Sequence, residues 1–215
     1  MTRHAATLAP PRRAPDLPAG PGGPRIGTGD GGGAAVRPPA SAISTAVWLL
    51  VGAITILFAA FTSTLLARRV EADWHVGPLP PILWASTAVL LLSSGVIEWA
   101  RRRGRQDRRD QLWTGLLGTA ALGLTFLGLQ WTAWRQLVAQ GIHLSSNPHS
   151  AFFYLLTGVH GLHLAGGLIW LAHALGRTRR APSAAVALTT VDPAAVYWHF
   201  LGMLWLYLFA ILFAV

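Results

Sequence analysis

The sequence predicts an all-α membrane protein, a bundle of five transmembrane helices with a cytoplasmic N-terminus and its C-terminus outside. Three observations carry this prediction: an apolar composition, five long apolar stretches, and an uneven distribution of arginine. Of the 215 residues, 53% are hydrophobic and only 12% are charged. Soluble domains average about 25% charged residues, so the composition argues against an ordinary soluble enzyme.

Charge and cysteine content exclude several other classes of protein. The chain has 17 arginines, no lysine and eight acidic residues, a net charge of +9. A nucleic-acid-binding protein would not be this apolar, and we expect no nucleic-acid partner. Because the sequence has no cysteine, disulfides, iron–sulfur clusters, thiolate zinc sites and thiolate-bridged copper centres are excluded.

Residues 1–42 differ in composition from the remainder. Their first forty positions hold eight prolines and eight glycines and no long aliphatic run. Such a segment buries too little apolar surface to offset its ordering entropy, which predicts a disordered tail. An apolar signal-peptide core of about 7–15 residues is not present here. A transit segment or a partner-binding arm is the alternative interpretation.

Five apolar stretches follow and form a single predicted domain over residues 43–215. Each has about 21–25 residues, enough to cross about 30 Å of hydrocarbon as an α-helix. Tryptophans near the stretch ends fit the interfacial aromatic belt. The predicted helices cover residues 44–67, 81–101, 112–135, 151–175 and 194–215.

Proline and capping residues mark three of the predicted helix starts. Pro80 and Pro81 open the second helix, and an Asn147–Pro148 pair precedes the fourth. For the fifth helix, Asp192 is the predicted N-cap and Pro193 the first helical residue.

Arginine placement predicts the orientation in the membrane. Five arginines lie in the tail, six in the loop after the second helix and three after the fourth. All 14 fall on one side of a five-span chain, against three on the other side. The positive-inside rule therefore places the N-terminus in the cytoplasm.

Small residues at four-residue spacing predict close helix packing, because lipid supplies no hydrophobic drive between helices. We expect the third and fourth helices to pack tightly along these faces, against each other or against a partner subunit. The stripes are Gly115, Thr119 and Gly123 on the third helix and Thr157, Gly161 and Ala165 on the fourth.

Histidines are the main candidates for chemistry. His160 and His163 lie one turn apart on the fourth helix, and His199 lies on the fifth. Buried polar groups in a membrane are functional candidates by default. One haem between His160 or His163 and His199 is one interpretation, and proton handling is a second.

The favoured interpretation of the histidines is structural. Their side chains would hydrogen-bond across helices to Gln130, Thr157, Tyr197 or a backbone carbonyl. An interfacial salt bridge is expected between Glu98 and Arg101 or Arg102, which follow it at three and four residues. We find no nucleophile–base pair, and expect no catalytic residue, cofactor or metal in this chain.

Two late motifs resemble the subunit III family of haem-copper terminal oxidases. They are FFYLLTGVHGLHLAGG at residues 152–167 and YWHFLGMLWLYLF at 197–209. Segments 79–100 and 128–134 add to the resemblance, which covers about residues 44–215. Five helices starting inside fit the short bacterial form of the family.

The resemblance implies an accessory, cofactor-free subunit in a bacterial plasma membrane, packed beside oxidase subunits I and II. Haem and copper would lie in those partners, and oxygen reduction with proton pumping would belong to the whole complex. Membrane lipids are further implied partners. The implied lipid-contact or subunit-contact residues are Gln130, His160, His163, Tyr197, Trp198, His199 and Trp205.

Two departures from the family pattern bear on proton relay. Ile54 stands where many members carry a glutamate, and Gly202 where many carry an aspartate. A quinol oxidase or a nitric oxide reductase therefore stays open as the complex served. An independent b-type cytochrome ranks lower, and a small transporter ranks last because the chain shows no internal repeat.

Overall fold

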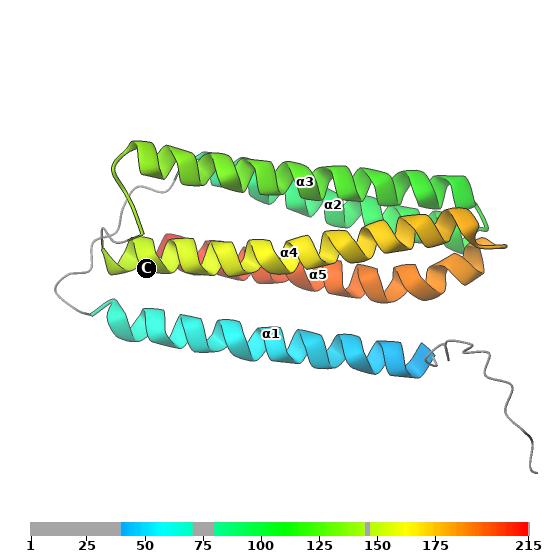
Figure 1. Ribbon diagram of the computed structural model, residues 1–215, viewed down its shortest axis with the longest axis horizontal. Coiled ribbons are helices and arrows are strands. Elements are labelled where there is room, and N and C mark those ends of the chain that lie inside the picture. The colour runs from blue at the N-terminus through cyan, green and yellow to red at the C-terminus, as the bar shows by residue number, and fades with distance from the viewer. Residues whose placement is uncertain (1–39, 71–79, 145–146, 215) are drawn as a thin grey trace, which may run out of the picture. The chain divides into compact units, whose positions relative to one another are not determined.

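A computed structural model describes residues 40–70, 80–144 and 147–214. Each of its helices is long and apolar enough to cross a membrane, so the predicted all-α fold with five membrane-spanning helices is confirmed. The tail predicted for residues 1–42 lies outside the described residues as far as residue 39. In chain order the helices are α1 (Ala40–Arg68), α2 (Ile82–Arg105), α3 (Arg109–Ala139), α4 (Pro148–Arg180) and α5 (Ala184–Ala214) (Figure 1).

The largest departure from the predicted boundaries is the start of α5. This helix begins at Ala184, and Pro193 lies inside it instead of opening it. Asp192 does not act as an N-cap because its carboxylate accepts a hydrogen bond from Arg101 on α2. The chain tolerates the internal proline, which normally removes one helical hydrogen bond and disfavours a helix by about 3 kcal/mol.

The start of α4 is fixed by local hydrogen bonds. The Asn147 side chain accepts from the Ser150 backbone N–H at 2.8 Å, and the Asn147 N–H donates to the Ser150 hydroxyl at 3.3 Å. This is a reciprocal capping box, with Pro148 directly after the cap. Both groups satisfy donors that a helix start otherwise leaves open.

The helices α2 to α5 pack as a four-helix group. Within this group, α2 and α4 each lie against both α3 and α5 (Figure 1). The first helix, α1, lies outside the group and contacts α4 and α5. Half of the apolar span of α5 is buried, against 22% of that of α1. The fifth helix is therefore the central one, and its Trp198 and Trp205 are the largest fully buried side chains.

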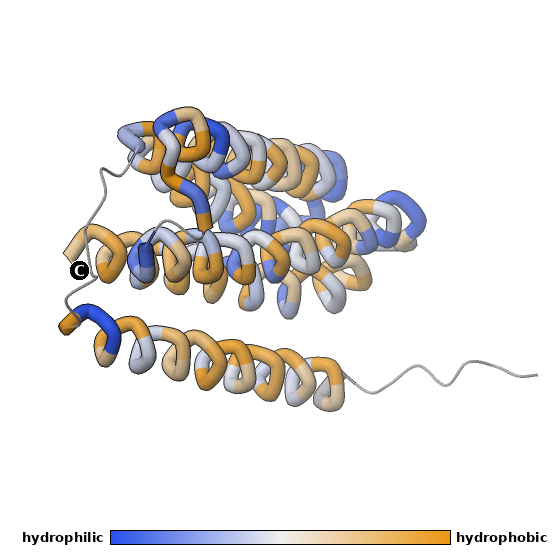
Figure 2. Tube along the Cα trace, turned by 60° about the vertical axis from the view of Figure 1, so that its left-hand side comes forward, coloured by the Kyte–Doolittle hydropathy of each residue, from blue (hydrophilic) through white to orange (hydrophobic). Residues whose placement is uncertain are grey.

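Hydrophilic residues gather toward the helix ends and hydrophobic ones follow the middle of the helices (Figure 2). Large apolar side chains also point outward, including Ile56, Leu162 and Ile169, each more than 70% exposed. An outward apolar band is what a helix group needs to face lipid or another membrane subunit.

The small-residue face of α3 packs mainly on α2 and α5. A Cβ added at Gly115 would lie 2.5 Å from the Ala100 Cβ of α2. One added at Gly123 would lie 2.6 Å from the Trp198 ring of α5. At Gly161 of α4 the nearest atom would be 3.8 Å away, an ordinary contact, so Gly161 is not a point of close helix approach.

Candidate functional site

Two buried tryptophans of α5 bond to hydroxyl groups of α2. The Trp205 indole N–H donates to the Thr87 hydroxyl at 2.9 Å. One level along, the Trp198 indole N–H donates to the Ser93 hydroxyl at 3.0 Å. All four residues are buried, so water does not reach these polar groups and they bond to each other instead.

The hydroxyl groups are oriented by their own helix. Thr87 donates to the Leu83 carbonyl at 2.8 Å and Ser93 donates to the Leu90 carbonyl at 2.6 Å. Each hydroxyl hydrogen is thus committed, and the oxygen offers lone pairs alone. An indole N–H is a donor without an acceptor function, so donor and acceptor match at both levels.

A charged contact joins α2 and α5 at a third level. Arg101 donates from Nε to Asp192 Oδ1 and from Nη1 to Glu98 Oε2, both at 2.8 Å. Arg102 Nε lies 3.5 Å from Glu98 Oε1, and its side chain is 73% exposed. His199 Nε2 lies 3.9 Å from Glu98 Oε2, which places His199 beside this charge cluster.

The third helix contributes two further polar contacts. Gln130 donates from Nε2 to the Ser86 hydroxyl of α2 at 2.9 Å. Trp134 donates its indole N–H to the Thr157 hydroxyl of α4 at 3.1 Å. Gln130 and Thr157 are therefore bonded to α2 and α3, and not to the histidines as the sequence suggested.

The two neighbouring histidines have different surroundings. His160 is fully buried, and neither ring nitrogen has a hydrogen-bond partner. The rings of Phe126 and Trp205 pack on it, with centroids 5.9 and 5.3 Å away. His160 thus lies in the aromatic centre of the α3–α4–α5 contact.

His163 faces α1, where the Phe58 ring centroid is 5.9 Å away. Its Nδ1 lies 2.8 Å from the Val159 carbonyl oxygen; since a carbonyl accepts only, Nδ1 carries the hydrogen. The Tyr197 hydroxyl donates to the backbone oxygen of His163 at 3.2 Å. The expected bond between Tyr197 and a histidine therefore reaches the main chain and not the ring.

The arrangement is one of packing and positioning. Over the described ranges, no three histidine or acidic side chains come together as a metal-binding group. His160 packs against Trp205. His199 precedes Trp205 by six residues, about 9 Å along α5, and lies at the level of Glu98. The structure does not bring these two histidines to one level.

A groove opens on the outer face where α3 meets α4. It has a volume of about 270 Å³. Gln130 and Thr157 contribute its polar atoms, and Gly158 and Gly161 leave the room that larger side chains would fill. The remaining lining residues are apolar or aromatic: Leu127, Trp131 and Trp134.

Sequence reasoning missed the acceptors Ser86 and Thr87, and it assigned Asp192 to a cap. A signal was present in the spacing. Hydroxyl residues recur at positions 86, 87 and 93 of an otherwise apolar helix, and Trp198 and Trp205 lie seven residues apart on the last helix. Thr87 and Ser93 accept from these two tryptophans, whereas Ser86 accepts from Gln130 of α3.

Comparison with known proteins extends the match to nearly the whole described chain. Residues 43–215 match the family model of cytochrome c oxidase subunit III. Cytochrome c oxidase subunit 3 of Bacillus sp. (strain PS3) is 29% identical over 174 residues, covering 77% of this chain and 82% of the relative. The subunit 3 of Alkalihalophilus pseudofirmus is 30% identical over 176 residues, covering 77% and 83%.

A relative from a quinol-oxidising complex is also similar. Cytochrome bo(3) ubiquinol oxidase subunit 3 of Pseudomonas aeruginosa is 28% identical over 133 residues, covering 62% of this chain and 64% of the relative. The chain belongs to the cytochrome c oxidase subunit III family, as an accessory subunit of a haem-copper oxidase complex.

Proposed function

We propose that this chain is a non-catalytic subunit that binds subunits I and II of its oxidase and stabilises them in the membrane. The family match over residues 43–215 carries the proposal. The hydrogen bonds of the buried polar side chains support it, because Trp198, Trp205 and Gln130 all donate to hydroxyl groups of α2. These side chains hold helices together, and haem and copper belong to the partner subunits.

The proposed orientation has the N-terminus in the cytoplasm and the C-terminus outside, in a bacterial plasma membrane. The 14 arginines on one side of the five spans, against three on the other, support it. Cysteine labelling of the cysteine-free chain tests it. Cysteines placed at exposed Arg105 and Arg180 should react with a membrane-impermeant reagent only after the cell is permeabilised. Labelling of both in intact cells would reverse the orientation.

Membrane lipids are proposed as partners of the outer groove between α3 and α4. Gly158 and Gly161 leave space for an acyl chain beside the rings of Trp131 and Trp134. A Gly158→Leu variant fills the groove from its floor and should lower the number of lipids that co-purify with the chain. Unchanged lipid content would contradict this part of the proposal.

Purification of the native complex tests the assignment to an oxidase. A tag on this chain should recover a large haem-bearing subunit, and the recovered complex should reduce oxygen. Recovery of the chain without any haem protein would overturn the proposal. The same preparation decides the electron donor: activity with reduced cytochrome c, and none with a quinol, is the expected result.

Two other complexes remain as second candidates. The similarity to a ubiquinol oxidase subunit 3 favours a quinol oxidase, which activity with quinol alone would establish. Nitric oxide consumption without oxygen reduction would point to a nitric oxide reductase. An independent b-type cytochrome is disfavoured because the rings of Phe126 and Trp205 occupy the surroundings of His160. A Soret band from the isolated chain would restore that candidate.

A further inference from the structure

The first turns of α5 are set apart from the rest of the helix by a proline. Pro193 lies inside α5 and has no N–H group, so the Thr189 carbonyl, four residues earlier, receives no helical hydrogen bond from this position. Sharp bends in long helices are commonly found at such prolines. Pro193 therefore divides α5 into a short end segment, residues 184–192, and a long segment, residues 194–214.

The end segment packs on the other helices mainly through small side chains. Ala184, Ala187 and Val191 are fully buried, and a buried alanine contributes only one methyl group. Leu188 is also buried and lies against α2, where a Cβ added at Gly104 would be 3.1 Å from Leu188 Cδ2. The long segment buries the rings of two tryptophans. Because apolar stabilisation grows with the area removed from water, the end segment is the less firmly packed part of α5.

Polar contacts hold the end segment at both of its ends. At its last residue, the Asp192 carboxylate accepts from Arg101 Nε of α2 at 2.8 Å. At its first residue, the Ala184 backbone N–H donates to Asp107 Oδ1 at 3.3 Å. Asp107 belongs to the turn between α2 and α3, and its carboxylate satisfies a donor that the start of a helix leaves open. The end segment is therefore fastened by a side chain at each end.

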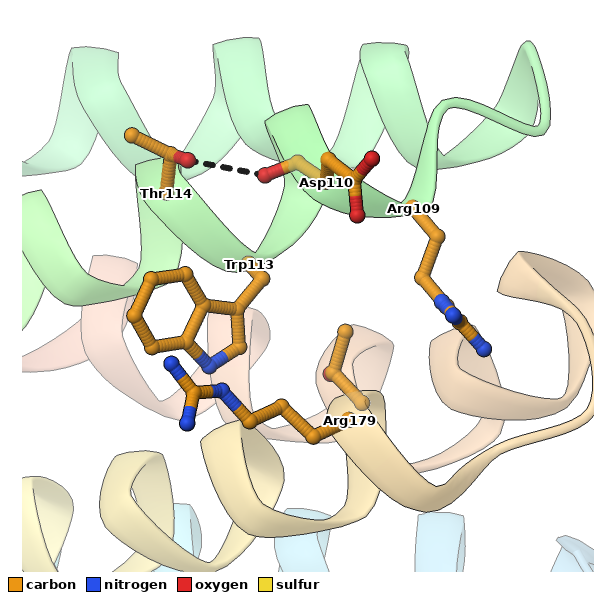
Figure 3. Close-up of a pocket in the computed structure, with 6 residues that line it drawn as sticks. Arg109, Asp110, Trp113, Thr114 and Arg179 are labelled. Atoms are coloured by element: carbon orange, nitrogen blue, oxygen red, sulfur yellow. Dashed lines mark hydrogen bonds between the residues drawn. The ribbon is translucent and has the colours of Figure 1, made fainter.

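The turn that supplies Asp107 makes a further contact. Asp107 has a φ of +57°, in the left-handed region that aspartate tolerates better than most residues other than glycine. Arg109, two residues later, donates from Nη1 to the Ala181 backbone oxygen at 2.7 Å. Its side chain lines a pocket between α3 and α4 and extends toward the end of α4 (Figure 3). This turn thus holds the connection between α4 and α5 at two points.

We propose that the end segment is a latched unit that opens at Pro193 while the long segment of α5 stays in place. The latch consists of three contacts, Arg101–Asp192, Asp107–Ala184 and Arg109–Ala181. Proteins open locally in units of unequal stability, and here the missing helical bond marks the boundary between two units. Opening separates Asp192 from Arg101 and exposes the charge cluster around Glu98 to solvent. The device uses this chain's own residues and is independent of which oxidase the chain serves.

Hydrogen exchange of the full chain in mild detergent, resolved to single amides, tests this division. The amides of residues 188–191 report on the end segment, and those of residues 198–205 report on the long segment. In the wild-type chain the amides of residues 188–191 should exchange about tenfold faster, since they need only the local opening. Equal exchange rates of the two stretches would overturn the proposal.

A substitution in the latch tests whether the two segments open separately. Asp192→Asn should speed the exchange of residues 188–191 by about fivefold, because a neutral amide is a weaker acceptor for a guanidinium than a carboxylate. The exchange of residues 198–205 should not change. Equal acceleration of both stretches would show that α5 opens as one unit, which contradicts the proposal.

The matched control for this substitution is Asp110→Asn. Asp110 is exposed in the first turn of α3 and lies outside the latch, so this variant should leave both stretches unchanged. If it accelerates residues 188–191 as much as Asp192→Asn does, the effect comes from net charge, and the latch is wrong.

Pro193→Ala tests the boundary itself and does not depend on weakening the fold. Alanine restores an N–H group that can bond to the Thr189 carbonyl, so residues 188–191 should exchange about tenfold more slowly than in the wild-type chain. Residues 198–205 should keep their exchange rate. If residues 188–191 are not slowed, or if both stretches are slowed equally, Pro193 is not the point at which the end segment opens.

Discussion

The indole nitrogen of Trp205 lies 2.9 Å from the hydroxyl oxygen of Thr87 and donates its hydrogen to it. The same two helices are joined at Trp198 and Ser93 and again at Asp192 and Arg101. Residue numbers rise along α2 as they fall along α5, so the helices run antiparallel. The three contacts extend over 14 residues of α2, about 21 Å.

Removing one indole donor should weaken this interface. Trp205→Phe keeps an aromatic ring but loses the N–H and part of the ring volume. We expect a loss of about 1–2 kcal/mol, since hydrogen bonds between membrane helices contribute about 0.6 kcal/mol and lost packing adds to that. Trp131→Phe is the control because Trp131 is 62% exposed. The free energy of unfolding of both variants is measured in denaturing detergent. An equal loss in Trp205→Phe and Trp131→Phe would contradict the role of the buried hydrogen bond.

The close approach at Gly115 makes a second prediction. An alanine there places its Cβ 2.5 Å from the Ala100 Cβ, so α2 and α3 must move apart. We expect a loss of about 1–3 kcal/mol, typical of overpacking. Gly128→Ala on the same helix meets nothing within 4 Å and should be neutral. The melting temperatures of the two variants give the comparison, and a harmless Gly115→Ala would contradict the packing.

The arginine between two carboxylates should matter more than its exposed neighbour. Arg101→Gln leaves Glu98 and Asp192 without their shared cation, and the Arg101 side chain is only 15% exposed. We expect a loss of about 1–3 kcal/mol, between the values for exposed and buried pairs. Arg102→Gln should have no measurable effect. High salt should reduce the gap between the variants, and equal stability of both would argue against the bridge.

The buried His160 leads to a prediction of opposite sign. His160 has no hydrogen-bond partner at either nitrogen, so an apolar side chain of similar volume should be neutral or stabilising. His160→Leu is expected to keep or raise the melting temperature. His160→Ala should lose about 2–4 kcal/mol because it leaves a cavity. If the leucine variant loses as much as the alanine variant, the imidazole bonds a group such as an internal water.

The presence and number of helices could be predicted because a membrane span requires a long apolar stretch, which the sequence shows directly. The helix ends could be predicted less accurately. Hydropathy marks the part within hydrocarbon, whereas α4 continues to Arg180 and α5 begins at Ala184. Pro193 misled the prediction because a proline next to an aspartate is typical of a helix start, and only the fold shows that Asp192 is bound to Arg101.

The hydrogen-bond partners of the aromatic residues on α5 could not be predicted from the sequence. Tyr197, Trp198 and Trp205 are buried and bonded, yet their acceptors lie more than 30 residues away in the chain. The sequence gives no distance between helices. Pairing Gln130 with Ser86 required the structure, because any of several hydroxyls in the apolar stretches has the same chemistry.

The committed hydroxyls of α2 have a consequence for the order in which the chain is built. During synthesis α2 enters the bilayer well before α5 exists. Since Thr87 and Ser93 already donate to carbonyls of their own helix, α2 can reside in lipid with these two hydroxyl hydrogens satisfied. The two indole N–H donors lie on α5, later in the chain, and bond to oxygens of α2 whose lone pairs are free to accept. When α5 packs onto α2, neither of these hydroxyls has to give up a hydrogen bond to accept from an indole.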